Sequence, residues 1–162
     1  MADETEQIAL IIADLDRFTR GEVVALALNI NGNLRENPPL GTPFDTGWAS
    51  ANWVPTVGEA SNLKADDKDP TPADIAARGQ VASDGLNAVL AWKPSDGAIF
   101  STNNVPYILP LNAGHSPQQA QPGFIQRAIE KAIRQTYSRG ASQASRARRG
   151  AAAQARKARP TR

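Results

Sequence analysis

Residues 139–162 constrain the fold most, because they cannot contribute to a hydrophobic core. This segment has no large apolar side chain and no acidic residue. Its basic residues are Arg139, Arg146, Arg148, Arg149, Arg156, Lys157, Arg159 and Arg162. Residues 1–138 hold all 16 acidic residues and 10 basic ones, a net charge of −6. We therefore expect an acidic globular domain over residues 1–138, followed by a basic C-terminal arm over residues 139–162. Alone the arm is expected to be disordered, and helical when docked.

The composition excludes several classes of protein. The 162-residue chain contains no cysteine, which excludes disulfides, thiolate metal sites and cysteine nucleophiles. No apolar run approaches the roughly 18 residues of a membrane span, and the acidic start MADETEQ does not suit a secretory signal. We expect a protein that is made in the cytoplasm and has no membrane partner.

Apolar residues recur at helical spacing in the N-terminal region. Those that share one face of a first predicted helix are Ile8, Ile11, Ile12, Leu15 and Phe18. Gly21 is expected to break or bend this helix. A second helix is predicted over residues 22–35, and Pro38 follows it as a stop signal.

Two more helices are predicted further along the chain. Thr71 is the expected N-cap and Pro72 the first residue of a helix that runs to about Leu90. Two glycines inside it favour either one weakened helix or two pieces. The last helix is expected to run from Pro122 or Gly123 to about Tyr137.

Extended segments complete the predicted fold. Residues 48–57 are predicted to form a strand with buried tryptophans, and residues 98–102 a short second strand. Residues 105–111 contain two prolines, so we expect an edge strand or an irregular path there. The expected fold class is α+β. Long N-terminal helices and a C-terminal helix would pack on a small, mostly antiparallel sheet, with the basic arm extending from it.

Candidate catalytic and metal-binding residues are few. His115 is the only histidine, and it stands in a polar loop where a solvated or interface role is expected instead of a triad. The cluster of Asp66, Asp67 and Asp69 lacks the glycine and the terminal glutamate of a calcium loop. The sequence contains no glycine-rich phosphate motif. We therefore expect no enzymatic activity, no cofactor and no metal site.

Aromatic and basic residues leave the kind of partner open. Trp48, Trp53 and Trp92 are expected in the core or at a subunit interface, because each buries a large area there. The arm suits nucleic-acid phosphates, an acidic groove of a partner subunit, or a solubilising role, since charge indicates only the sign of what is bound.

Three stretches resemble signatures that occur together in one family. Residues 42–53, TPFDTGWASANW, resemble the signature P-V-D-T-G-x-x-x-x-x-W. Residues 93–107, KPSDGAIFSTNNVPY, resemble a strand followed by N-N-x-P-Y. Residues 111–124, LNAGHSPQQAQPGF, resemble the loop L-E-x-G-x-S-x-Q-A-P-x-G that opens the last helix, with Asn112 where the glutamate usually stands. Over about residues 20 to 137 the chain thus resembles the neck and tail-completion proteins of long-tailed bacteriophages.

The resemblance implies a structural virion protein at the head–tail junction. It implies a homo-oligomeric ring, a hexamer, that joins the head connector or adaptor to the tail terminator or tail tube and leaves a channel for DNA. Assembly would take place in the host cytoplasm. Expected interface or loop-shaping residues are Asp45, Thr46, Gly47, Trp53, Asn104, Pro106, Tyr107, Gly114 and His115.

Local chemistry supports a shaping role for these loops. Asp45 and Thr46 suit hydrogen bonds to nearby backbone N–H groups, and Gly47 suits a positive φ. The resemblance does not cover the arm, whose eight basic residues are predicted DNA or partner contacts from their charge alone. Two other functions stay open: a tail-terminator ring that caps the tail tube, and a nucleic-acid-binding protein that acts through the arm.

Overall fold

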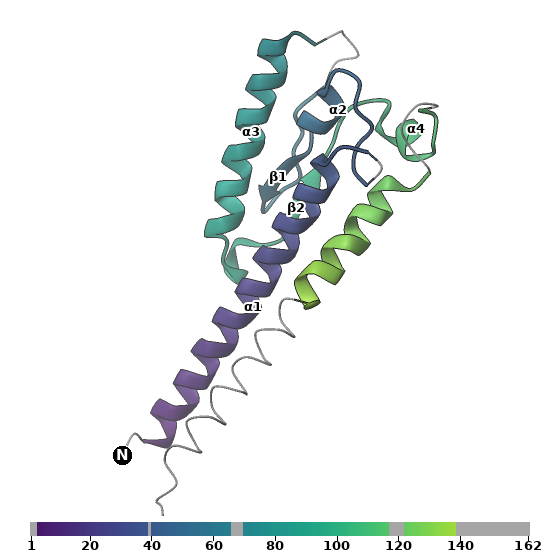
Figure 1. Cartoon of the computed structure of the whole chain (residues 1–162). Coiled ribbons are helices and arrows are strands. Elements are labelled where there is room, and N and C mark those ends of the chain that lie inside the picture. Colours follow the sequence, from purple (N-terminus) through teal and green to yellow (C-terminus); the bar gives the residue numbers. More distant parts are fainter. Residues whose placement is uncertain (1–2, 39, 66–69, 117–121, 139–162) are drawn as a thin grey trace, which may run out of the picture.

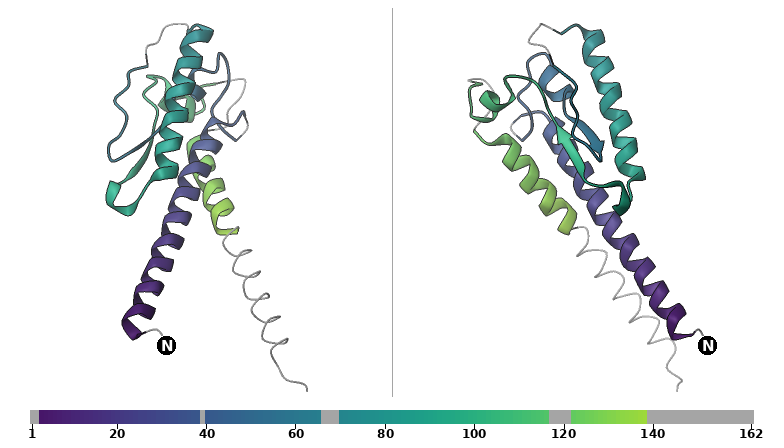
Figure 2. Two further views of the ribbon diagram at one scale, coloured as in Figure 1. Left: turned by 90° about the vertical axis from the view of Figure 1, so that its left-hand side faces the viewer. Right: turned by 180° about the vertical axis from the view of Figure 1, so that it is seen from behind.

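A computed structural model describes residues 3–38, 40–65, 70–116 and 122–138, and the fold is α+β as predicted. It is mostly helical, with a two-stranded antiparallel sheet between α3 on one side and α1 on the other (Figure 1). The last described helix, residues 124–138, lies beside the C-terminal half of α1 (Figure 2). None of the helices in the described part is long and apolar enough to cross a membrane.

The N-terminal region forms one long helix, α1 (Glu4–Arg35), instead of the two predicted helices. Gly21 neither breaks nor ends it. A single exposed glycine costs a helix about 1 kcal/mol, which the intact hydrogen bonding on both sides can offset. At about 1.5 Å per residue the helix is about 48 Å long, and its N-terminal half projects beyond the other described elements (Figure 1).

The predicted strand over residues 48–57 is wrong in its first half. Residues Trp48–Ala51 form a helical turn, α2, and only Val54–Val57 form strand β1. β1 pairs with β2 (Ile99–Thr102), so that Val54 lies opposite Thr102 and Val57 opposite Ile99. The second strand is thus confirmed within one residue of its predicted start.

Helix α3 (Pro72–Ala91) begins as predicted and continues as one piece. The hydroxyl oxygen of Thr71 accepts from the Asp74 backbone N–H at 3.2 Å, and an Asp74 carboxylate oxygen accepts from the Thr71 N–H at 2.9 Å. This reciprocal capping box satisfies two N–H groups at the start of the helix. Gly85 brings the helix against β1, because a Cβ there would collide with the backbone carbonyl of Pro55.

The region after β2 is helical where an extended path was predicted. After a buried Val105, residues Ile108–Asn112 form the short helix α4. Pro110 is tolerated there because a proline in the first turn removes an N–H that has no partner within the helix. A single-turn 3-10 helix, η1 (Pro94–Asp96), connects α3 to β2.

The core lies where α1, α2 and the helix 124–138 meet the loops between them. It contains the buried side chains of Leu34, Trp48, Ala49, Trp53, Ala65, Val105, Ile108, Phe124 and Ala128. All three tryptophans are buried, as predicted. The apolar face predicted for the first helix does not belong to this core. Its residues are each more than half exposed: Ile8, Ile11, Ile12, Leu15 and Phe18.

Candidate functional site

The chain leaves α1 through a tight turn that leads to the first motif. Thr42 closes this turn, since both its backbone N–H and its hydroxyl donate to the carbonyl oxygen of Leu34, at 3.1 Å and 2.6 Å. The indole N–H of Trp53 donates to the same hydroxyl oxygen at 2.7 Å. Trp53, predicted as an interface or loop-shaping residue, is therefore buried and holds the turn to the start of β1.

Thr46 and Gly47 shape the entry to α2 with the backbone chemistry that the sequence predicted for these two residues. Gly47 has φ +87°, which a residue with a side chain rarely adopts, and its carbonyl oxygen accepts the N–H of Ala51 at 2.9 Å. The hydroxyl oxygen of Thr46 accepts the backbone N–H of Trp48 at 3.3 Å. Asp45 is exposed. The segment thus fixes a left-handed turn that leaves its acidic side chain accessible.

The Asn103-Asn104 pair ties the second motif to other loops. The Asn103 side-chain amide donates to the Ala49 carbonyl at 2.8 Å, and its carbonyl oxygen accepts the N–H of Val105 at 3.1 Å. The Asn104 amide donates to the carbonyl oxygens of Ser61 and Leu63, at 2.9 Å each. These side chains therefore fix backbone paths between separate segments, as was predicted for Asn104.

The third motif links α4 to the last helix. The side-chain oxygen of Asn112 accepts the N–H of Ile125 at 3.0 Å, and its backbone carbonyl accepts the N–H of Gly123 at 2.7 Å. Asn112 therefore takes the place of an N-cap residue for the helix 124–138. Gly114 has φ +90°, and a Cβ there would lie 2.8 Å from Cγ of Pro122.

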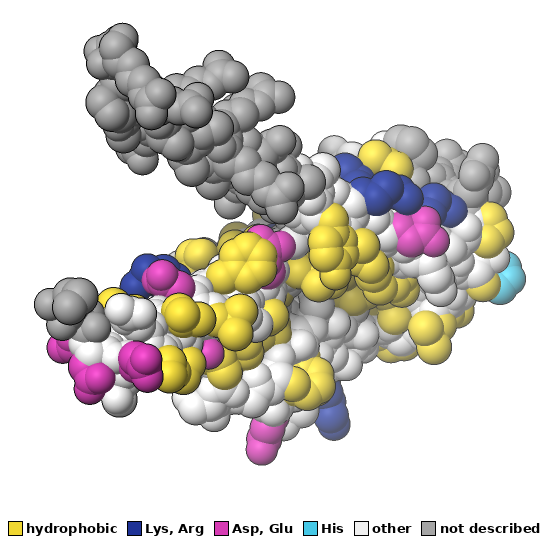
Figure 3. All heavy atoms as spheres, turned by 90° about the horizontal axis from the view of Figure 1, so that it is seen from below, with side chains coloured by type: hydrophobic (Ala, Val, Ile, Leu, Met, Phe, Trp, Pro, Cys, Tyr) yellow, Lys and Arg dark blue, Asp and Glu magenta, His cyan; other side chains and the backbone are white. Residues whose placement is uncertain are grey.

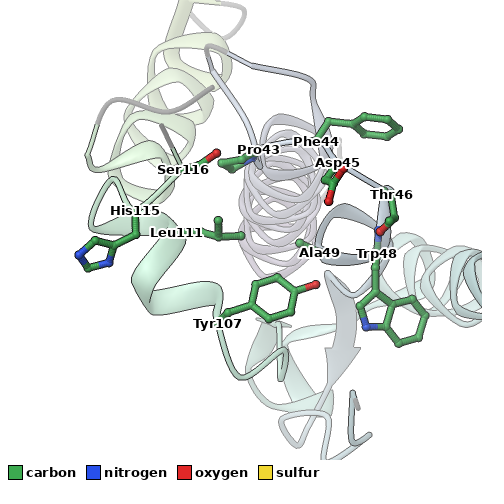
Figure 4. A pocket seen from close by; sticks show the side chains of 11 residues that line it. Pro43, Phe44, Asp45, Thr46, Trp48, Ala49, Tyr107, Leu111, His115 and Ser116 are labelled. Atoms are coloured by element: carbon green, nitrogen blue, oxygen red, sulfur yellow. The ribbon is translucent and has the colours of Figure 1, made fainter. Parts of the chain in front are cut away.

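These three motifs meet in one open cleft of about 340 Å³. The cleft is lined by residues of the first motif, by Tyr107 of the second motif, and by Leu111 and His115 of the third. The Asp45 carboxylate and the Tyr107 hydroxyl point toward the cleft, whereas the His115 ring points away from it (Figure 4). Helices α2 and α4, which contribute to its lining, lie at the end of the molecule opposite the N-terminal half of α1 (Figure 1).

The cleft offers binding chemistry: one carboxylate, one phenol, and the half-exposed ring of Phe44. Trp48 forms one wall, and the guanidinium of Arg78 lies over its ring at 5.5 Å from the centroid. In the described part of the chain no three His, Asp or Glu side chains are grouped to hold a metal ion. A shallow polar and aromatic cleft of this kind suits a side chain or loop of another protein.

Several predicted site residues lie elsewhere. Pro106 is exposed beside Val105, and Asn104 stabilises the loop at residues 61–63 instead of lining the cleft. The acidic residues Asp66, Asp67 and Asp69 and the basic residues of the arm, 139–162, lie outside the described residues.

The structure adds an exposed apolar surface, where the sequence predicted only that the apolar residues of the first helix share one face. Apolar side chains gather over the projecting half of α1 (Figure 3), where every residue from 3 to 19 is exposed. Their helical spacing was visible in the sequence, but spacing alone does not say which molecule covers a helix face.

Comparison with family models and curated proteins, and of the structure with solved structures, gives no match.

Proposed function

We propose that the chain is a structural subunit of the head–tail junction of a long-tailed bacteriophage. In this role it forms a neck or tail-completion ring that joins the head connector to the tail and leaves a channel for DNA. It acts by binding, with no chemical step. The partners are copies of itself, the head connector or adaptor proteins, and the tail terminator or tail tube.

One observation carries the proposal: the three stretches that resemble this family come together around a single cleft. The first stretch ends at Trp53 and the second begins at Lys93, yet Gly47 lines the same hollow as Tyr107 and His115. The residue types in these stretches serve backbone geometry, through a left-handed glycine and amides that bridge loops. Such residues define the shape of a surface, which is what an assembly protein presents to its neighbours.

The charges support a second, separate contact. The described part of the chain is acidic overall, whereas the arm carries eight basic residues and no acidic one. We place the arm against DNA phosphates in the channel or against an acidic surface of a neighbouring protein. Either partner would make its binding weaken as salt rises.

The phage that encodes the chain provides the test. A stop codon early in the gene should give full heads and separate tails of normal length that fail to join, as seen by electron microscopy of the lysate. Supplying the protein from a plasmid should restore joined, infectious particles. Tails of abnormal length would instead indicate the tail-terminator function, and normal infectious particles would exclude both.

The nucleic-acid-binding alternative makes a different prediction. If the chain acts alone through its arm, the purified monomer binds DNA tightly at low salt and loses that binding steeply as salt increases. Particles lacking the protein would then still join heads to tails.

A further inference from the structure

One face of α1 receives the helix 124–138 along its C-terminal half. The two helices run antiparallel, because Asn33 donates to the Ala128 carbonyl and Asn29 to the Thr136 hydroxyl, at 3.0 Å each. The same face continues toward the N-terminus, at steps of three and four residues, through Leu26, Glu22, Phe18, Leu15, Ile11 and Ile8. The last described helix therefore lies on only one part of a face that runs the length of α1.

The remaining part of this face is apolar and exposed. Its residues, here called the exposed stripe, are each more than half exposed: Ile8, Ile11, Ile12, Leu15 and Phe18. Phe18 also lines a hollow of about 680 Å³ together with Thr136 and Tyr137. The exposed stripe thus begins where the last described helix ends. A contiguous row of such side chains calls for an apolar cover.

The segment that follows the last helix has the length to reach the whole stripe. Residues 139–158 continue from Ser138, at the end of a helix that runs toward the N-terminus of α1. As a helix they would extend about 30 Å, and the stretch of α1 from residue 22 to residue 4 measures about 27 Å on the same scale. Pro160 comes just after this segment, where it suits the end of a helix.

The segment also carries small side chains in the row that would face α1. Ile129 and Tyr137 line the hollows beside α1. Their row continues, at steps of three and four residues, through Gly140, Ala144, Ala147, Ala151, Ala155 and Ala158. Alanine favours a helix and lets two helices approach closely, so that the large side chains of the stripe fill the space between them.

The spacing of the alanines matches that of the stripe. Asn29 lies beside Thr136, which sets the register of the antiparallel pair. Counting down α1 and up the following segment brings Leu15 within one residue of Ala151, and Ile11 within one residue of Ala155. The two rows would therefore meet without a shift in register.

Charge favours the same pairing. Residues 3–22 carry six acidic and two basic side chains, whereas residues 139–162 carry eight basic side chains and no acidic one. One of the two basic side chains, Arg20, already donates to the carbonyl oxygens of Trp92 and Leu90, at 2.6 Å and 3.3 Å. At 100° per residue, Asp14 and Asp16 flank the stripe on its two edges, within reach of arginines on a helix that covers it.

We infer that residues 139–158 form a helix that packs antiparallel on the exposed stripe of the same chain. The alanine row faces α1, and the arginines face its carboxylates. The stripe supplies the burial without which an isolated helix of this length is marginal in water. The contact occupies the basic residues in the free subunit, so DNA or an acidic neighbour has to displace the arm from α1 in order to bind it. The inference does not rest on the proposed function.

A disulfide reads this contact directly, since the chain has no cysteine of its own. In the full-length protein, Leu15→Cys with Ala151→Cys should form a bond within one chain under mild oxidation, because a disulfide needs Cα atoms within about 7 Å. Leu10→Cys with Ala151→Cys is the matched control: Leu10 is as exposed as Leu15 (64% and 61%) but lies on another face of α1. Non-reducing electrophoresis should show that the first pair closes at least about tenfold faster than the control pair.

Hydrogen exchange tests the contact with the arm unmodified. Amides of residues 144–158 should exchange at least about tenfold more slowly in the wild type than in Leu15→Lys, which places a cation against the arginines of the arm. Leu10→Lys should keep the wild-type protection. Both substitutions change exposed side chains, so thermal unfolding of the rest of the protein should stay as in the wild type.

Two results would overturn the inference: equal closure rates of the two cysteine pairs, or exchange in the wild type as fast as in Leu15→Lys. Disulfides formed mainly between two chains would also overturn it, and would assign the stripe to a second copy. None of these measurements depends on where the protein sits in a virion, so the proposed function stands or falls separately.

Discussion

The indole N–H of Trp53 donates a 2.7 Å hydrogen bond to the Thr42 hydroxyl, which donates in turn to the Leu34 carbonyl at 2.6 Å. All three residues are buried. This chain of hydrogen bonds connects the end of α1, the turn before the first motif and the start of β1. A single hydroxyl therefore positions the segment that leads to the cleft.

Replacing that hydroxyl should destabilise the fold. Thr42→Val keeps the size of the side chain but leaves the buried Trp53 N–H without its acceptor, which should lower the free energy of unfolding by about 1–3 kcal/mol. Urea denaturation followed by tryptophan fluorescence measures the change. Thr5→Val, at an exposed position of α1, is the control and should change stability by less than about 0.5 kcal/mol.

Two glycines of α3 should respond in opposite directions to the same substitution. Gly85→Ala places a Cβ against the Pro55 carbonyl, so it should destabilise the protein by about 1–3 kcal/mol. Gly79→Ala meets no atom within 4 Å and should stabilise the helix by up to about 1 kcal/mol. Thermal denaturation of both variants provides the comparison. Equal effects would mean that α3 does not pack on β1 as described.

Asn112 should support the last helix through its side chain. Asn112→Ala removes the acceptor for the Ile125 N–H and should cost about 1 kcal/mol. Asn112→Asp keeps an acceptor oxygen and should retain most of the stability. Hydrogen exchange at residues 125–127 should increase in the alanine variant alone; unchanged exchange there would contradict the capping role.

The capping box of α3 should make stability depend on pH in the acidic range. Hydrogen bonds from the side chain and the backbone of Thr71 lower the pKa of Asp74 below its ordinary value of 3.8. The charged form is therefore favoured in the folded state, so its contribution is present above pH 3.8 and is lost as pH falls through the lower folded pKa. In Asp74→Asn the free energy of unfolding should fall less steeply below that pH than in the wild type. Parallel curves of unfolding free energy against pH for the two proteins would contradict this prediction.

The sequence predicted the features that depend on neighbouring residues. The α3 cap at Thr71, the left-handed Gly47 and the strand at residues 99–102 are local, because turn and capping chemistry acts over a few residues. The prediction failed where one apolar pattern fits both a strand and a short helix. Residues 48–51 are as apolar as a strand, yet the Gly47 turn and the Asn52 side chain, which donates to the Trp48 carbonyl at 2.8 Å, stabilise a helical turn.

The cleft could be predicted only in part. Its motif residues were identified, but their meeting depends on long-range contacts such as Asn103 with Ala49. The exposure of Ile11 and Leu15 was not predictable either, because periodicity indicates an apolar face without indicating whether the same chain buries it.

The position of the protein in the virion tests the account most directly. Purified particles carrying an epitope tag on the chain can be labelled with gold-conjugated antibody and imaged by electron microscopy. The account predicts gold at the junction between head and tail in joined particles, and at no other place. Label at the distal end of the tail, or particles that contain none of the protein, would contradict it.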